Sequence, residues 1–161
     1  MKKSPYIIVN KLVIEGVNKN YQVEFKEGLN IIWGDVDSGK SSILNFISYC
    51  LGGSNFGLQY EEIVKKARIA KLEINLSGNV ITFERLVHDI KSPIKAYYCN
   101  IDSVQEVYPK LLDPSTSSGY DGWISDYILD QLGIPKVKIK ESNLRDDAES
   151  DRLSFKDLMK L

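Results

Sequence analysis

Residues 34–41 read GDVDSGKS and match G-x-x-x-x-G-K-[ST], a pattern whose residue types suit the binding of a nucleoside triphosphate. Its glycines let the backbone fold so that successive N–H groups point at phosphate oxygens. Lys40 places a point charge between the β- and γ-phosphates and is the predicted catalytic residue, while Ser41 offers a hydroxyl to Mg²⁺. The residues predicted to bind the nucleotide are Gly34, Asp37, Ser38, Gly39, Lys40, Ser41 and Ser42, with ATP and Mg²⁺ as the predicted cofactors.

A phosphate-binding loop of this kind, called the phosphate cradle below, has to lie between a buried strand and a helix. LNIIW (29–33) has the apolar pattern of that strand, and YQVEF (21–25) before it predicts a β-hairpin closed by residues 26–28. From Lys40 onwards, apolar residues recur at helical spacing until the glycines at 52–53 end the helix. The start of that helix adds unpaired N–H groups and a positive dipole end. Because strand and helix are both predicted, a glycine-rich turn that matches the motif by chance is the weaker interpretation.

The remaining elements predict an α/β fold. A strand is expected at 6–15, irregular near Asn10, and a second hairpin joins 71–76 to 80–87 through the turn at 77–79. Further elements are expected as a strand at 93–100, a weak helix at 101–112, a helix at 123–132, a strand at 136–140 and a helix that begins at Ser154. Ser154 and Asp157 have the spacing of a capping box, with Asp in place of Glu.

The order of first strand, hairpin, GLNII, motif, helix and YCLGG resembles the N-terminal lobe of ABC-class ATPases of the SMC, RecF and SbcC type. The resemblance covers residues 7 to about 90. It implies a P-loop NTPase fold in which an antiparallel β-layer surrounds a P-loop strand and helix. It also implies ATP hydrolysis by the intact protein, in DNA repair or genome defence.

The motif departs from the loop of that family, G-P-N-G-x-GKSS, at three positions. Asp35, Val36 and Asp37 stand where the family has Pro, Asn and Gly. Carboxylates in this loop oppose a triphosphate unless they point outward or reach Mg²⁺ through water. Asn18 also stands where the family often has an Arg that reaches the nucleotide.

Other motifs of the family are absent from the sequence. A Walker B segment needs apolar residues that end in Asp-Glu; neither YYCNID (97–102) nor YILD (127–130) provides this ending. LSGN (76–79) resembles the ABC signature, but it lies between two strand patterns and predicts a hairpin turn. We therefore expect residues 1–161 to be the N-terminal part of a head domain, truncated before the Gln-loop and a coiled coil. The implied partners are a C-terminal lobe of the same ATPase, a second head in a homodimer, and DNA.

Two alternatives stay open: a self-contained small-molecule kinase, and a nucleotide-binding module without hydrolysis. The first is disfavoured because the four arginines are scattered and form no clustered lid. The basic residues at 65, 66, 68 and 71 are interpreted as a solvated face in preference to a surface that contacts DNA.

Composition limits the class of protein. Lys plus Arg number 21 against 22 Asp plus Glu, and the net charge of −1 excludes a global basic field. Pro5, Asn10 and Lys11 interrupt the N-terminal apolar run, so no secretory signal is expected. No stretch approaches the roughly 18 apolar residues of a membrane span. Cys50 and Cys99 predict two buried free thiols in a reducing, cytoplasmic setting.

Overall fold

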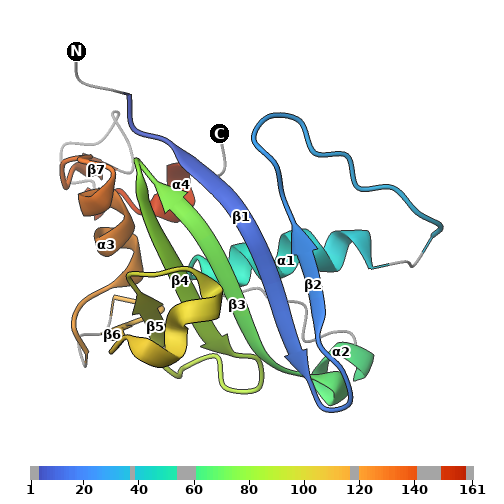
Figure 1. Cartoon of the computed structure of the whole chain (residues 1–161). Coiled ribbons are helices and arrows are strands. Elements are labelled where there is room, and N and C mark those ends of the chain that lie inside the picture. Colours follow the sequence, from blue (N-terminus) through green and yellow to red (C-terminus); the bar gives the residue numbers. More distant parts are fainter. Residues whose placement is uncertain (1–3, 37–38, 54–60, 117–119, 141–149, 159–161) are drawn as a thin grey trace.

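The computed structural model describes residues 4–36, 39–53, 61–116, 120–140 and 150–158, and it has the predicted α/β class. Six strands form one antiparallel sheet in the order β2-β1-β3-β4-β5-β6 (Figure 1). Their bounds are β1 Ile7–Gly16, β2 Tyr21–Glu24, β3 Ala67–Leu76, β4 Asn79–Leu86, β5 Ile94–Tyr97 and β6 Lys110–Leu112. The helices are α1 Lys40–Cys50, α2 Glu61–Lys66, α3 Ile124–Gln131 and α4 Phe155–Leu158, with a 3₁₀ helix η1 at Ile101–Glu106. A small two-stranded sheet pairs β7 Lys138–Lys140 with β8 Ser150–Arg152.

The centre of the large sheet follows the alternation of apolar and polar residues. Leu12 on β1 lies opposite Leu72 on β3, which lies opposite Phe83 on β4, and each is at most 2% exposed. The predicted irregularity in the first strand is confirmed as a register shift between Val9 and Lys11. The side chain of Asn10, the residue between them, donates to Glu73 Oε1 at 3.1 Å. These strands form the layer against which α1 packs.

Helix α1 covers the apolar face of this sheet, as Figure 1 shows. It buries Phe46, Tyr49 and Cys50. The opposite face carries a charge network across four strands. Lys71 on β3 lies between Glu15 on β1 and Glu84 on β4, and Glu84 also pairs with Lys95 on β5 at 2.8 Å. The two faces therefore differ in chemistry, and α1 is held by the apolar one.

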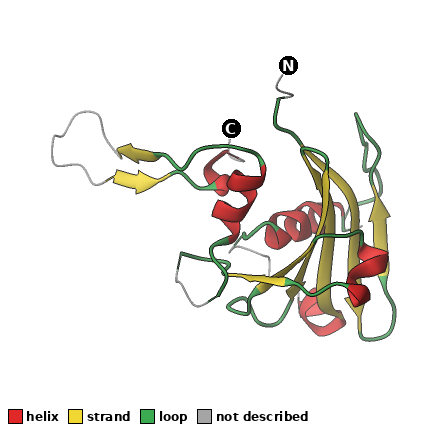
Figure 2. Ribbon diagram, turned by 60° about the vertical axis from the view of Figure 1, so that its left-hand side comes forward, coloured by secondary structure: helices red, strands yellow, loops and turns green. Residues whose placement is uncertain are grey.

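The C-terminal residues form a smaller group of elements beside the sheet, which Figure 2 shows with the β7–β8 hairpin extending outward. The backbone N–H of Phe155 donates to Ser125 Oγ at 2.6 Å and so joins α4 to α3. The predicted capping box is confirmed, because Ser154 Oγ accepts from Asp157 N at 3.2 Å and the Asp157 carboxylate accepts from Ser154 N at 3.0 Å.

Two predictions about local structure are wrong. No strand forms at 29–33, so neither the predicted hairpin nor the expected P-loop strand is present. The Asn30 side chain instead closes a turn, accepting from Lys26 N at 2.9 Å and donating to Lys26 O at 2.7 Å. In the second case, the weak helix expected at 101–112 is η1 followed by β6, because Ala96 and Ile94 on β5 pair with Lys110 and Leu112. Cys50 is buried as predicted, but Cys99 is only partly so.

Candidate functional site

The N-terminus of α1 lies at the end of the GDVDSGKS motif. Gly39, the residue before the first helical one, has φ of 84°, in the left-handed region that favours glycine. A Cβ there would meet nothing within 4 Å, so the backbone angle and not crowding requires glycine. The first turn of α1 contains no acidic residue, and none of the described side chains caps it. Its N–H groups and its positive dipole end are therefore suited to an anion.

Lys40 brings its charge back over the motif. Its Nζ donates to the backbone oxygen of Gly34 at 2.7 Å and to that of Asp35 at 2.5 Å. The side chain thus joins the first residue of the helix to the first two residues of the motif. Charged acceptors make stronger hydrogen bonds than carbonyls do. We therefore expect phosphate oxygens to replace these carbonyls when a nucleotide binds.

Ser41 and Ser42, two further predicted site residues, lie in the first turn of α1. Ser41 is exposed in the first turn of α1, and Ser42 is half-buried. Asp35 is exposed. Asp37 and Ser38 lie outside the described residues. Within the described ranges, no group of three or more His, Cys, Asp or Glu could hold a metal. Mg²⁺ itself takes few protein ligands and is otherwise held by phosphates and water.

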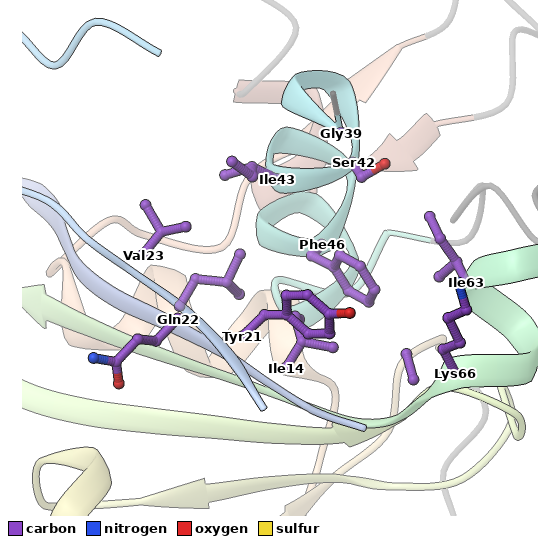
Figure 3. A pocket seen from close by; sticks show the side chains of 12 residues that line it. Ile14, Tyr21, Gln22, Val23, Gly39, Ser42, Ile43, Phe46, Ile63 and Lys66 are labelled. Atoms are coloured by element: carbon purple, nitrogen blue, oxygen red, sulfur yellow. The ribbon is translucent and has the colours of Figure 1, made fainter. Parts of the chain in front are cut away.

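A cavity of about 450 Å³ begins beside Gly39 and Ser42 and continues between α1 and the edge of the sheet. Figure 3 shows Ile43 and Phe46 of α1 on one side of it, Tyr21 and Val23 of β2 on another, and Ile63 and Lys66 of α2 opposite β2. Its lining is mostly aliphatic and aromatic. The volume falls in the range of roughly 300–1,000 Å³ that is usual for small-molecule sites.

The opposite end of α1 is anchored by a buried arginine. Arg85 on β4 is 2% exposed, and its Nη1 donates to the backbone oxygens of Tyr49 at 2.6 Å and Gly53 at 3.0 Å. Its Nη2 donates to Ile90 O at 2.9 Å, and its guanidinium lies 3.9 Å from the centre of the Tyr49 ring. Burial lowers the pKa of Arg85, although the nearby Tyr49 and Cys50 oppose this shift. A cation at the C-terminal end also suits the helix dipole, so Arg85 fixes α1 relative to the sheet.

Sequence reasoning missed the roles of Arg85 and Tyr21. Arg85 counted only as one of four scattered arginines. The available signal was its position in the strand VITFERLV. Side chains alternate between the two faces of a strand, so Arg85 faces the same way as the buried Ile81 and Phe83. Tyr21 gave a weaker signal. Its inward orientation depends on pairing opposite Ile14, and a single strand pattern does not reveal the register.

The described part of the motif places Lys40 and the start of α1 beside Gly34 and Asp35 on an α/β scaffold. Comparison with protein families found a match to the AAA domain over residues 11–159. The chain belongs to this family of nucleotide-binding P-loop ATPases. Comparison with curated proteins and with solved structures found no significant match. In the described part of the chain, no helix is both long and apolar enough to cross a bilayer.

Proposed function

We propose that the chain binds Mg-ATP as the N-terminal part of an ATPase head of the SMC, RecF and SbcC type. The observation that carries the proposal is the start of α1, where a left-handed Gly39 opens an uncapped helix and Lys40 lies over the motif. The AAA-domain match supports nucleotide binding at this point. Lys40 would hold the β- and γ-phosphates, Ser41 would ligate Mg²⁺, and Ser42 would contact the α-phosphate side.

Exposed apolar residues near the motif support a further lobe as the partner of this one. Leu29, Ile31 and Trp33 are 88%, 75% and 88% exposed, and they alternate as the residues on one face of a strand do. Leu44, on the outer face of α1, is 62% exposed. An exposed apolar segment that pairs with no strand is suited to pairing with a strand of another lobe. A C-terminal lobe of the same ATPase would cover it and would also supply the Walker B and signature residues that the sequence lacks.

The finer parts of the proposal rest on resemblance alone. A homodimer of heads, DNA as a partner, and a role in DNA repair or genome defence follow from the resemblance to the SMC, RecF and SbcC type. The kinase alternative gains no support from the structure, since Arg85 is buried and Arg152 pairs with Asp126 at 2.7 Å. A binding module without hydrolysis is the second candidate, because the sequence contains no apolar run that ends in Asp-Glu.

Titration calorimetry with Mg-ATP tests the proposal. Lys40→Ala removes the cation that lies over the motif and should weaken binding at least about tenfold. Lys91→Ala, which removes an exposed lysine outside the motif and outside the cavity beside Gly39, is the matched control and should leave affinity unchanged. ATP turnover by the wild-type chain should not exceed that of Lys40→Ala, because the sequence contains no Walker B glutamate. Equal affinity of wild type and Lys40→Ala would refute the cradle, and turnover well above the variant would refute the need for a second lobe.

A further inference from the structure

A second cavity, of about 380 Å³, lies at the C-terminal end of α1, opposite the end that carries the phosphate cradle. Gly52 just after α1 and Arg85 on β4 contribute to its lining, together with Lys91 in the loop between β4 and β5 and residues 113–115 after β6. Among the described residues, none lines both this cavity and the one beside the cradle. Two basic side chains and the carboxylate of Asp113 therefore border a space that is separate from the proposed nucleotide site.

Arg85 is a buried cation without a negatively charged partner in the described ranges. It is 2% exposed, and none of the ion pairs among the described residues includes it. Its two Nη atoms donate to three backbone carbonyls, while its Nε is enclosed and makes no hydrogen bond to the described part of the chain. Charged side chains are seldom fully buried unless an opposite charge accompanies them. The protein atoms around Arg85 thus satisfy most of its donors and leave its charge uncompensated.

The titratable groups beside Arg85 do not supply the missing negative charge. Tyr49 and Cys50 are the neighbours that raise the pKa of Arg85 against the effect of burial. Burial raises the pKa of the Cys50 thiol to about 12 and also raises the pKa of the Tyr49 phenol, so both groups are neutral at neutral pH. The Asp113 carboxylate accepts from the backbone N–H of Tyr120 at 3.4 Å and forms no ion pair with Arg85. With Arg85 and Lys91 against Asp113, the cavity lining keeps a net positive charge.

We propose that this second cavity binds the phosphate group of a small molecule, held between Arg85 and Lys91. Guanidinium and ammonium groups both bind phosphate in proteins, and hydrogen bonds between ions are roughly twice as strong as neutral ones. Lys91 is exposed at the cavity, and the Asp89 carboxylate beside it in sequence accepts from the Lys91 backbone N–H and lies outside the lining. The volume lies in the range that is usual for small-molecule sites, so a phosphate monoester fits as well as the free ion.

Titration calorimetry with inorganic phosphate, at an ionic strength held constant with sodium chloride, tests the proposal. Lys40→Ala weakens phosphate binding at the cradle, so the binding that this variant retains belongs to another site. Adding Lys91→Ala to Lys40→Ala should reduce the remaining phosphate affinity about tenfold. Lys138→Ala, which removes an exposed lysine of β7 that lines neither cavity, is the matched control and should leave this affinity unchanged. A titration with phenyl phosphate then distinguishes a monoester from the free ion.

Arg85 is best observed without substitution, because Arg85→Ala is expected to destabilise the fold. The Nε–Hε group of each arginine gives a signal in a proton–nitrogen correlation spectrum, and replacing the other three arginines in turn assigns the signal of Arg85. This signal should shift as phosphate is added, with the midpoint that calorimetry gives. Lys91→Ala should move that midpoint to a phosphate concentration about tenfold higher.

If Lys40→Ala abolishes all phosphate binding, phosphate binds only at the cradle, and the second site is refuted while the proposed function stands. The second site is also refuted if Lys91→Ala matters no more than Lys138→Ala, or if the Arg85 signal does not shift. Phenyl phosphate that binds as tightly as inorganic phosphate supports the site and identifies a monoester as its ligand. Binding of inorganic phosphate alone supports the site and identifies the free ion.

Discussion

The two ends of α1 differ in almost every physical respect. At the C-terminal end, Tyr49 and Cys50 are at most 1% exposed, and the carbonyls of Tyr49 and Gly53 are bound by Arg85. At the N-terminal end, Gly39 and Ser41 are exposed, and the segment that leads into the motif lacks regular secondary structure. One end is therefore fixed by the sheet, and the other is the end at which we propose that the nucleotide binds. Under that proposal, stability and nucleotide binding are separated along a single helix.

The largest expected effect comes from removing the anchor. Arg85→Ala removes the guanidinium that donates to the carbonyls of Tyr49, Gly53 and Ile90, and it opens a cavity. It should lower the free energy of unfolding by about 3–5 kcal/mol. Urea denaturation measures the change. Arg68→Ala, which removes an exposed arginine at the start of β3, should stay within about 0.5 kcal/mol of wild type. Similar values for the two variants would show that Arg85 does not fix the helix.

An intermediate effect is expected from alkaline pH, because burial raises the pKa of the Cys50 thiol to about 12. The raised pKa means that the folded state keeps its proton while the unfolded chain loses it. Stability is therefore fully present below the ordinary thiol pKa, near 9, and falls as the pH rises toward 12. The slope approaches about 1.4 kcal/mol per pH unit for this group.

Urea denaturation between pH 8 and 10.5 measures this slope. Cys50→Ala should flatten it, whereas Cys99→Ala, at a less buried thiol whose pKa burial raises less, should change it little. If Cys50→Ala leaves the slope as steep as in wild type, the C-terminal end of α1 is more open than the structure shows.

The smallest effect on stability is expected from two glycine substitutions, one at the start of α1 and one in the loop after β2. Gly39→Ala and Gly28→Ala each place a Cβ at a left-handed position, with φ of 84° and 92°, and neither Cβ would meet an atom within 4 Å. Each should cost about 1 kcal/mol of stability. Only Gly39→Ala should also weaken Mg-ATP binding, because it alters the backbone that aims the N–H groups. Equal affinities of the two variants would place the ligand away from the start of α1.

The sequence predicted the elements whose patterns are local. The β3–β4 hairpin was predicted because KLEINL alternates and Ser77-Gly78 suits a tight turn, and α1 was predicted from its periodicity and its terminal glycines. The segment 29–33 was predicted wrongly for a physical reason. Its apolar pattern indicates that the residues are suited to burial. A strand also needs a neighbouring strand with which to form hydrogen bonds, and the local sequence does not show whether that neighbour is present.

Some residues around α1 could be predicted from the local sequence, and others could not. The motif located Gly39, Lys40 and Ser41 because spacing along the chain defines a phosphate cradle. Tyr21 and Arg85 are brought toward α1 by strand pairing, so their positions depend on register and not on spacing. Long-range pairing is the part of the structure that a single sequence determines least directly.

Strand pairing also bears on the order in which the chain folds. β3 and β4 are joined by the two residues Ser77 and Gly78, whereas β1 and β3 are neighbours in space that enclose residues 17–66 between them. Closing the longer loop costs more chain entropy, so β1 should join the sheet after the β3–β4 hairpin has formed. The hydrogen bond from Val17 N to Lys66 O, at 2.8 Å, then closes that loop at its base. The motif and α1 thus lie in an excursion of the chain between two strands that are neighbours in the sheet.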